Sequence, residues 1–140
     1  MNPTRDSEAQ VRRLFANDRL AKHLGITLVE AGPGRAVTRL TVAENHLNIY
    51  SGGHGGTLFA MADATFGLAC NSRAHVSIAI SAHIAFVKGV QVGDVLTARA
   101  TEQARTRRAG TYLVEIRRAD DALVATFTGV AHVSDKAIEI

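Results

Sequence analysis

The chain has 140 residues, of which 46% are hydrophobic and 21% are charged, and its formal net charge is +3. A chain of this length is near the common size of one domain and buries roughly 68–70% of its unfolded surface, so we expect residues 1–140 to form a single domain. Lys and Arg are spread along the chain and aromatic residues make up only 5%, whereas nucleic-acid-binding proteins gather positive charge on one face. The composition therefore argues against a nucleic-acid partner.

Targeting and membrane segments are not expected. The first ten residues contain no apolar core of the kind that a signal peptide needs. The apolar run that follows Gly56 ends at Cys70 and is interrupted by Asp63, which makes it too short and too polar to span a bilayer. Cys70 is the only cysteine, which excludes an intrachain disulfide and fits a reducing compartment. We expect a cytoplasmic protein with no membrane partner.

The first third of the chain predicts two short helical segments and a hairpin. Residues 7–17 carry apolar residues at helical spacing, with Ser7 as a candidate N-cap, and a second segment follows after a break, over residues 20–24. Residues 26–31 and 35–43 have the composition and alternation of strands, and the Gly-Pro-Gly turn between them predicts a hairpin.

Residues 55–70 predict a helix whose surface is apolar almost all the way round. Two glycines, Gly55 and Gly56, open this helix, and Asp63 is its only charged residue. A helix that is hydrophobic on every side must be buried. We therefore expect the rest of the chain to wrap around it.

The last part of the chain predicts four strands. Residues 76–87 alternate strictly and predict one apolar face, formed by Ile78, Ile80, Ala82, Ile84 and Phe86. Residues 95–105, 111–117 and 123–133 follow, separated by turns, as in an antiparallel meander. The element order predicts an α+β fold in which an antiparallel sheet wraps around the long central apolar helix. The outer face of this sheet, with further apolar rows, is left to meet another subunit.

Asp63 is the residue that most needs an explanation. An ionised carboxylate on an apolar surface is costly unless something satisfies it. Its helical neighbours three and four positions away cannot neutralise it, since they are Phe59, Ala60, Phe66 and Gly67. One interpretation is an ion pair with an arginine or histidine elsewhere in the fold. The other is a general base or nucleophile whose pKa is raised by burial.

The start of the predicted helix offers a place for negative charge. The first N–H groups of a helix have no partner within it and lie at the positive end of its dipole, so Gly55 and Gly56 offer donors to an oxyanion. His54-Gly55-Gly56 on its own also suits a tight helix start that excludes side chains. With Asn48 upstream and Asp63 downstream, the combination favours a catalytic site over a purely structural one. In such a site the N–H groups stabilise an oxyanion and the carboxylate activates water.

The pattern Asn48-x5-His54-Gly55-Gly56-x6-Asp63 resembles the signature of hotdog-fold acyl-CoA thioesterases of the phenylacetate-degradation (PaaI) type, and the Ala-Cys-Asn-Ser segment at the predicted helix end is similar to that branch. The resemblance implies a sheet that wraps the helix, dimers that pair into homotetramers, and active sites at the dimer interface. It implies that Asp63 is the catalytic carboxylate and that the Gly55 N–H polarises the thioester carbonyl. It also implies that Asn48 and His54 place the water or the carbonyl.

Two positions depart from the family pattern. The family loop often has a glycine three residues after the asparagine, whereas Ser51 stands there in this chain and two glycines follow it. A hydroxyl that assists water in some relatives falls at Ala79 in this sequence. Ser77 and Ser81 are therefore the remaining hydroxyl candidates on the predicted strand.

Basic residues are candidates for binding the phosphates of coenzyme A. Arg107 and Arg108 lie in a predicted turn and are either solvated or, together with Lys88 or Arg73, bind these phosphates. The histidines show no metal-ligand spacing, and the sequence contains no nucleophile-elbow, phosphate-loop or dinucleotide-binding motif. We therefore expect no metal and no cofactor.

The sequence predicts an acyl-CoA thioesterase that hydrolyses an aromatic, phenylacetyl-like acyl-CoA to the free acid and coenzyme A. One alternative is a hotdog-fold enoyl-CoA hydratase or dehydratase in which His54 and Asp63 act as a base–acid pair, but the double glycine and Asn48 favour the thioesterase. A second alternative is a non-catalytic acyl-CoA sensor. The segment before the first predicted strand is too short for the DNA-binding module that such sensors carry.

Overall fold

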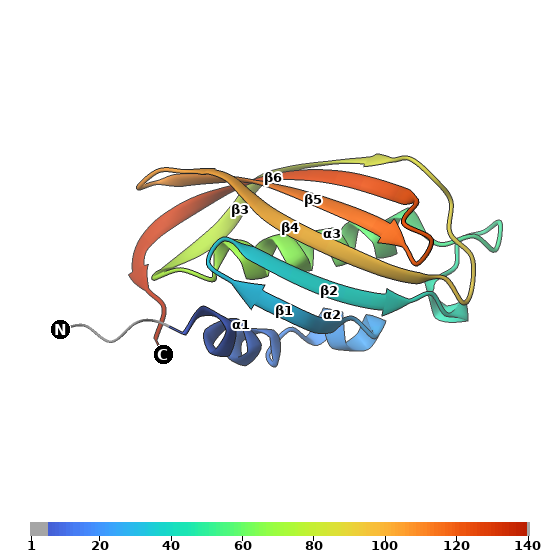
Figure 1. The fold of residues 1–140 in the computed structure, drawn as a ribbon, viewed down its shortest axis with the longest axis horizontal. Helices are drawn as coiled ribbons and strands as arrows, with labels where there is room; N and C mark the ends of the chain where they lie inside the picture. Colours follow the sequence, from blue (N-terminus) through green and yellow to red (C-terminus); the bar gives the residue numbers. More distant parts are fainter. Residues whose placement is uncertain (1–5, 140) are drawn as a thin grey trace.

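The computed structural model describes residues 6–139, which form one antiparallel sheet curled around a central helix (Figure 1). The helices are α1 (Ser7–Phe15), α2 (Arg19–Leu24), the short 3-10 helix η1 (Glu44–His46) and α3 (Gly55–Cys70). The strands are β1 (Thr27–Gly32), β2 (Arg35–Thr41), β3 (His75–Phe86), β4 (Val95–Arg105), β5 (Ala109–Arg118) and β6 (Leu123–Ala137). The strand order is β1-β2-β4-β5-β6-β3, and every neighbouring pair is antiparallel. The predicted α+β arrangement is confirmed.

The position of α3 organises the molecule. This helix lies against the concave face of the sheet and contacts all six strands, while α1 and α2 run along the β1 side (Figure 1). One edge strand, β1, is therefore packed against α1. The other edge strand is β3, which begins soon after α3 ends.

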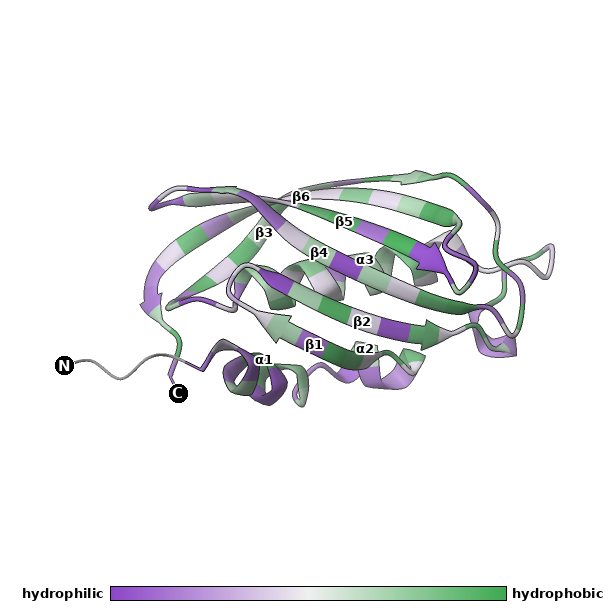
Figure 2. Cartoon of the chain, viewed as in Figure 1, coloured by the Kyte–Doolittle hydropathy of each residue, from purple (hydrophilic) through white to green (hydrophobic). Residues whose placement is uncertain are grey.

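The core lies between α3 and the sheet. Phe66 of α3 meets Tyr112 of β5 and Phe127 of β6, with ring centroids 5.5 and 5.7 Å apart. Gly129 of β6 makes room for the Phe66 ring, because a Cβ at this position would lie 2.8 Å from it. Hydrophobic and hydrophilic residues alternate along the strands (Figure 2), as expected for a sheet with one buried face.

Acidic residues cap the two N-terminal helices. Asp6, rather than the predicted Ser7, caps α1, since its Oδ1 accepts a hydrogen bond from the Ala9 N–H at 3.0 Å while Ser7 is buried. Asp18 caps α2 in the same way, and its Oδ1 accepts from the Ala21 N–H at 2.9 Å. The predicted break lies between Phe15 and Arg19, and Asp18 at its end starts the second helix.

Two strands extend beyond their predicted ends. β5 begins at Ala109, within the predicted turn, because Gly110 pairs with Arg105 of β4. β6 continues past residue 133 to Ala137, which pairs with His75 at the start of β3. Cross-strand pairing therefore lengthens both strands past the point where the local alternation stops.

The prediction of a single apolar face on β3 is wrong. Ala79 pairs with Ala131 of β6 and Ser81 pairs with the adjacent Val130, so one extra residue forms a bulge in β3. The bulge reverses which alternate residues face α3. Ile78, before the bulge, is 60% exposed, whereas Ile84, after it, packs against the core.

The prediction that α3 is buried on every side is wrong for the single chain. Its sheet-facing side is buried, but a stripe at helical spacing remains open. On this stripe Phe59 and Asp63 are exposed, and Ala60, Ala64 and Gly67 are half-buried. We call these five residues the open stripe of α3. The stripe is apolar apart from its one carboxylate.

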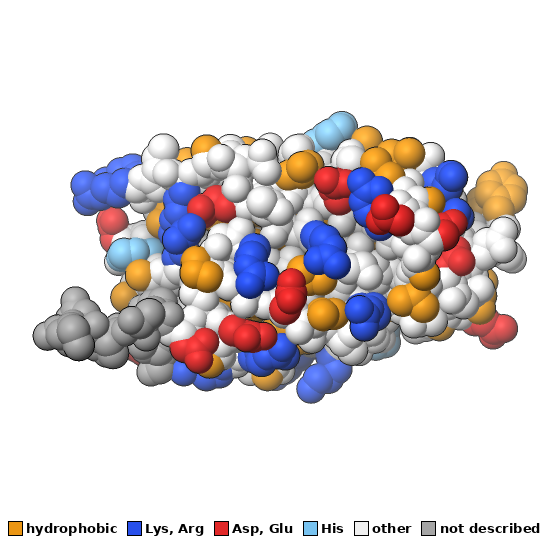
Figure 3. Space-filling model, in the orientation of Figure 1, with side chains coloured by type: hydrophobic (Ala, Val, Ile, Leu, Met, Phe, Trp, Pro, Cys, Tyr) orange, Lys and Arg blue, Asp and Glu red, His pale blue; other side chains and the backbone are white. Residues whose placement is uncertain are grey.

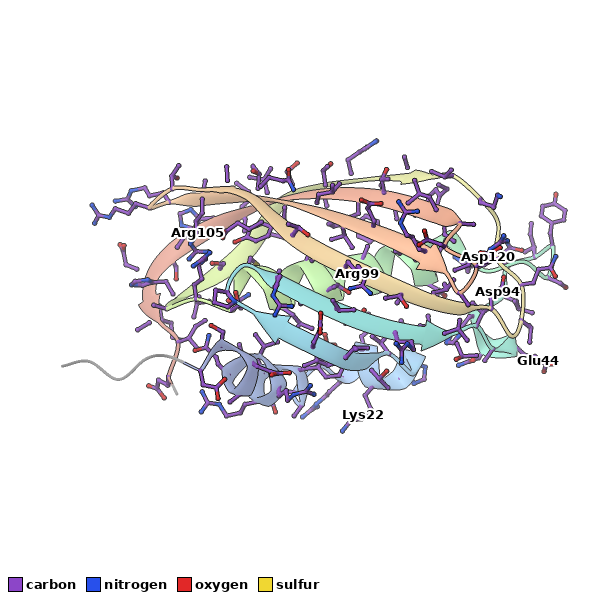
Figure 4. The ribbon with its side chains drawn as sticks, viewed as in Figure 1. Lys22, Glu44, Asp94, Arg99, Arg105 and Asp120 are labelled. Carbon is purple, nitrogen blue, oxygen red and sulfur yellow. The ribbon has the colours of Figure 1, made fainter. Side chains whose placement is uncertain are left out.

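The outward face of the sheet carries charges where apolar rows were predicted. Over β2, β4 and β5 it presents Arg39, Arg99, Glu115 and Arg117, and Figure 3 shows basic and acidic side chains spread across this face. Figure 4 labels Arg99 on the outward face of β4. Several large apolar side chains remain exposed on β3 or next to it: Ile78, Ile80, Phe86 and Val87. The β3 edge therefore offers apolar surface to a second molecule.

Candidate active site

His54 caps the start of α3 with its side chain. Its Nδ1 accepts a hydrogen bond from the Gly56 N–H at 2.8 Å. An accepting Nδ1 carries no proton, so the neutral ring has its proton on Nε2 and can donate it to another group. The side chain is exposed, and His54 and Gly56 border a mostly apolar cavity of about 300 Å³. The histidine of the motif is thus a helix cap with one free donor.

Gly55 offers the predicted donor at the start of α3, and α3 begins at this residue as expected. Its backbone N–H has no hydrogen-bond acceptor among residues 6–139. A Cβ at Gly55 would lie 3.0 Å from the ring of Phe86 at the end of β3, so this ring packs beside the glycine. The arrangement provides an unpaired N–H at the positive end of a helix, as an oxyanion site requires.

Asn48 shapes the loop that leads to this helix start. Its Oδ1 accepts hydrogen bonds from the Tyr50 N–H at 2.8 Å and the Gly52 N–H at 3.2 Å, and its own N–H donates to the Gly52 carbonyl at 2.8 Å. The side-chain amide NH₂ has no partner in the described part of the chain. Asn48 therefore holds a turn through its oxygen and keeps its nitrogen available.

The departure from the family loop has a local explanation. Ser51 adopts the left-handed conformation, with φ at 62°, that glycine usually occupies. Gly53 donates its N–H to the Val90 carbonyl at 2.8 Å, and a Cβ there would lie 2.2 Å from the Val90 side chain. Ser51 thus takes the left-handed position without being a glycine, and Gly53 is the residue whose side chain would clash, because the backbone there approaches the segment after β3.

Asp63 lies in the wall of a cavity of about 670 Å³ rather than in the interior. The cavity is lined by Leu14, Asp18, Asp63, Ala64, Gly67, Leu68, Asn71, Val76, Ser77, Lys136, Ala137, Ile138 and Glu139. The Asp63 side chain is exposed, and among residues 6–139 it has neither a hydrogen bond nor an ion pair. Partial burial in this wall raises the pKa of Asp63, and the nearby Asp18 carboxylate raises it further. Among residues 6–139, Asp63 therefore has no arginine or histidine partner for the structural ion pair considered as an alternative.

Of the two candidate serines, only Ser77 shares the cavity with Asp63. Ser77 is buried, and its hydroxyl donates to the His75 carbonyl at 3.3 Å. Asn71, which the sequence reasoning did not single out as a site residue, clamps this strand: its Oδ1 accepts from the Ser77 N–H at 2.9 Å and its Nδ2 donates to the Ser77 carbonyl at 3.0 Å. Ser81 is exposed in the β3 bulge.

Arg73 is engaged in a network that the sequence did not reveal. Its guanidinium donates to both carboxylate oxygens of Glu102, at 3.0 and 2.7 Å, and the Tyr112 hydroxyl donates to the same carboxylate at 2.9 Å. The Arg73 hydrogen bonds hold the pKa of Glu102 below its usual value, and burial raises the pKa of Tyr112 to about 12. Arg105, labelled in Figure 4, donates to the Tyr112 hydroxyl at 3.2 Å. Arg73 thus fastens β4 to the end of α3.

The remaining basic candidates lie far apart. The Lys88 N–H donates to the Val124 carbonyl at one end of β6, and the Val133 N–H donates to the Arg108 carbonyl near the other. This separation along β6 corresponds to about 30 Å. Lys88 and the exposed pair Arg107 and Arg108 therefore cannot hold the same phosphate within one chain.

The buried histidine serves a structural purpose. His46 accepts the Ala43 N–H on Nδ1 at 2.9 Å and donates from Nε2 to the Leu24 carbonyl at 2.7 Å. Residues 6–139 contain no group of three His, Cys, Asp or Glu side chains that could hold a metal ion. Over the same residues, no helix is long and apolar enough to cross a membrane.

Comparisons with known proteins place this fold among characterised relatives. A sequence model of the thioesterase superfamily matches residues 53–125. The acyl-coenzyme A thioesterase PaaI of Escherichia coli (strain K12) is 37% identical over 85% of this chain and 85% of its own length. A putative esterase of Archaeoglobus fulgidus is 32% identical over 85% of this chain and 77% of its own length. The solved structure of the E. coli PaaI protein, from the phenylacetic acid degradation operon, has a TM-score of 0.90 and 33% identity, covering 96% of this chain and 100% of that one.

Proposed function

Because the chain belongs to the thioesterase superfamily and is an acyl-CoA thioesterase of the PaaI type with the hotdog fold, we propose that it hydrolyses aromatic, phenylacetyl-like acyl-CoA to the free acid and coenzyme A. In this proposal Asp63 is the general base or nucleophile, and the Gly55 N–H polarises the thioester carbonyl. His54 and Asn48 orient the reacting groups. The operon of the E. coli relative supports the aromatic acyl group.

The observation that carries this proposal is the environment of Asp63. Its carboxylate has no partner among residues 6–139, faces a cavity large enough for an acyl group, and has a raised pKa. A carboxylate that accepts a proton more readily than usual is suited to general base catalysis near neutral pH. Apolar walls from Leu14, Leu68 and Ile138 suit an apolar acyl group.

One chain is not expected to supply both reacting residues to the same thioester. Asp63 follows Gly55 by two turns of α3, which corresponds to about 12 Å along the helix axis. The Gly55 N–H also points beyond the helix start, away from Asp63. Since reacting atoms must approach to about 3–3.5 Å, we propose that Gly55 of one subunit and Asp63 of a second subunit act on one thioester.

The open surfaces of the chain support such a pairing. β3 is an edge strand, with Ile78 and Ile80 exposed at 60% and 65%, and exposed edges are places where strands of two chains pair. A two-fold axis that joins two β3 edges antiparallel also brings the open stripes of the two α3 helices together in opposite directions. Each helix start then faces the middle of the other helix. We propose this homodimer, with two dimers forming a tetramer.

The chemistry follows from these positions. The thioester carbonyl oxygen accepts the Gly55 N–H, which makes the carbon more electrophilic. Asp63 then takes a proton from water as the water attacks, which gives the free acid directly. In the alternative route Asp63 attacks the carbon itself and forms an anhydride, which water then hydrolyses to the free acid and the Asp63 carboxylate. A preorganised donor such as the Gly55 N–H stabilises the resulting oxyanion by roughly 2.7–4 kcal/mol. The C–S bond breaks and the sulfur takes a proton, which releases coenzyme A as its thiol.

The cap made by His54 weighs against the hydratase alternative. A histidine base needs an unprotonated ring nitrogen that faces the substrate, but Nδ1 of His54 is already occupied by the Gly56 N–H. The free Nε2 carries a proton in the neutral ring and donates it. His54 is therefore better suited to orienting the carbonyl than to removing a proton.

We propose that Arg107 and Arg108 bind the phosphates of coenzyme A. Both side chains are exposed and form no ion pair within the described part of the chain. Arg73 is already committed to Glu102. Lys88 follows Phe86, whose ring lies beside Gly55 at the start of α3. Lys88 is the alternative phosphate ligand if the coenzyme A chain extends from the thioester towards this end of β3.

The test is a thiol-release assay across a panel of acyl-CoAs. Wild type and Asp63→Asn are compared with phenylacetyl-CoA, benzoyl-CoA, short aliphatic acyl-CoAs and a long-chain acyl-CoA. We expect the highest kcat/KM with the aromatic substrates, and activity that depends on Asp63. Equal or better activity with long-chain substrates would reject the aromatic assignment, and an active Asp63→Asn would reject the mechanism.

A further inference from the structure

A second carboxylate faces the cavity that contains Asp63. Asp18, which lies between α1 and α2, lines the same cavity of about 670 Å³. Asp63 belongs to α3, and α2 packs against α3. The two carboxylates therefore approach the cavity from different elements, and nothing in the local sequence predicts that they meet.

Asp18 is held rigidly by its role as a helix cap. Its Oδ1 accepts the Ala21 N–H at 2.9 Å, its backbone N–H donates to the Phe15 carbonyl at 2.9 Å, and its carbonyl accepts the Lys22 N–H at 3.2 Å. These three hydrogen bonds fix both the backbone and the carboxylate. The Asp18 carboxylate is therefore a fixed charge on the wall of the cavity that Asp63 also lines.

Resting on the proposed role of Asp63, we propose that Asp18 is a positioning residue for catalysis, whose fixed negative charge on the wall of the same cavity acts on the Asp63 carboxylate and helps it to accept a proton. Like charges that share a partly water-excluded site disfavour the ionised form of each other. The pKa of Asp63 is raised first by burial and second by the charge of Asp18. A base whose pKa lies closer to the working pH takes a proton more effectively.

The other groups around Asp63 leave Asp18 as the dominant charge. α1 contributes Leu14 to the cavity and β3 contributes Val76 and Ser77, all uncharged. Cys70 of α3 is a neutral thiol, because burial raises its pKa to about 12. The remaining charged groups on the cavity wall are Lys136 of β6 and Glu139 after it, both exposed and opposite in sign. Neither forms an ion pair with Asp63.

The variant that tests this role is Asp18→Asn. Asparagine caps helices about as well as aspartate, so the change removes the charge while keeping α2. Asp6→Asn is a matched control, because Asp6 caps α1 through the same kind of hydrogen bond to the Ala9 N–H but does not line the cavity. Both variants lose one negative charge and retain one cap.

Two measurements are made on the full-length assembled protein. The first is the titration of the Asp63 carboxyl by ¹³C NMR after labelling of aspartate side chains, with the Asp63 signal identified by its loss in Asp63→Asn. The second is the pH dependence of kcat/KM with phenylacetyl-CoA. The NMR titration does not depend on turnover, so it separates this inference from the proposed function.

We expect Asp18→Asn to lower the Asp63 titration midpoint by about half a pH unit, the size expected for two partly screened carboxylates. The acidic limb of the pH profile of kcat/KM should move to lower pH by the same amount in Asp18→Asn. At a fixed pH on that limb, kcat/KM of the variant should then be about threefold higher than that of wild type. Asp6→Asn should move neither. At about 1 M salt the difference should shrink, because the Debye length falls to about 3 Å.

An unchanged midpoint in Asp18→Asn, or an equal shift in Asp6→Asn, overturns the inference. A shifted midpoint without a matching shift of the acidic limb overturns the catalytic role of Asp18. If the midpoint shifts but no protein, wild type included, releases thiol, the proposed function fails while the electrostatic coupling of the two carboxylates stands.

Discussion

Nδ1 of His54 lies 2.8 Å from the backbone nitrogen of Gly56 and accepts its hydrogen bond. The histidine of the motif therefore satisfies one of the unpaired N–H groups at the start of α3, and the hydrogen bond orients its ring. The adjacent Gly55 N–H is left without an acceptor in residues 6–139. The helix start is thus divided into one capped donor and one donor available to a substrate.

Two substitutions of His54 should separate capping from donation. His54→Ala removes the cap, which should lower the free energy of unfolding by about 0.5–2 kcal/mol, and it also removes the Nε2–H donor, so activity should fall without vanishing. His54→Asn retains a capping acceptor, so its stability should be close to wild type while kcat/KM stays low. Thermal unfolding and thiol release measure the two effects. Full activity in His54→Asn would contradict the donor role.

Asp63→Asn should lower kcat by about 10²–10⁴-fold without lowering the Tm. Burial, and then Asp18, raise the pKa of Asp63 in the folded chain above its ordinary value of 3.8, so the folded state binds this proton more tightly than the unfolded state. Stability from this group therefore falls as the pH rises from 3.8 through the raised value. At neutral pH the variant should melt at the same or a higher temperature than wild type, and this difference should disappear in acid. A lower Tm at neutral pH would mean that Asp63 makes a stabilising contact.

Gly55 should tolerate no side chain. An added Cβ would lie 3.0 Å from the Phe86 ring and would crowd the start of the helix. We expect Gly55→Ala to lose about 10²-fold or more in kcat/KM and Gly55→Val to be inactive in the thiol-release assay. Phe86→Ala and the double variant Gly55→Ala/Phe86→Ala are the controls. If the double variant regains kcat/KM, the loss in Gly55→Ala is caused by crowding against Phe86 and not by exclusion of the substrate.

Arg73 and Arg108 should respond differently to alanine substitution. Arg73→Ala removes the bidentate bond to Glu102 and should lower the free energy of unfolding by about 1 kcal/mol, since Arg73 is partly solvent-exposed. The combined Arg107→Ala/Arg108→Ala variant should instead raise KM and leave the Tm unchanged. Denaturant unfolding and steady-state kinetics distinguish the two cases. A raised KM in Arg73→Ala at unchanged stability would instead show that Arg73 binds the phosphates of coenzyme A.

The Arg73–Glu102 pair should also give stability a pH dependence. Arg73 lowers the pKa of Glu102 below its ordinary value of 4.5, so the pair stabilises the fold above that value. The stabilisation is lost as the pH falls through the lowered pKa. Wild type and Arg73→Ala should therefore converge in stability in acid, as followed by denaturant midpoints across that range. A constant difference between them would contradict the ion-pair explanation.

The β3 edge should control both assembly and activity. Ile78→Glu places a charge among the exposed apolar residues of this edge and should yield a monomer without thioesterase activity, since the proposed site needs two subunits. Val92→Glu, at a residue 52% exposed in the loop after β3, is the control for adding a charge to an exposed apolar position. Light scattering of the wild type should show at least a dimer. A wild-type monomer at micromolar concentration would contradict the two-subunit site.

Features that depend on neighbouring residues were predictable from the sequence. α3 runs from Gly55 to Cys70 as expected, because a glycine start and an apolar run with one interruption are local signals. The β1–β2 hairpin forms around its predicted turn for the same reason. The pattern from Asn48 to Asp63 resembles the signature of a thioesterase family, and the comparisons confirm the family.

Features that depend on distant residues became visible only in the tertiary structure. The bulge in β3 arises from its pairing with β6, and the Arg73–Glu102 bond joins residues that share no local pattern. Asp18 and Asp63 meet in one cavity because α2 folds against α3. The sequence determined which side chains carry charge, hydrogen-bond donors and apolar surface. The tertiary structure decided which of them act on one another, because electrostatic and hydrogen-bond energies depend on distance in space and on solvent exposure rather than on separation along the chain.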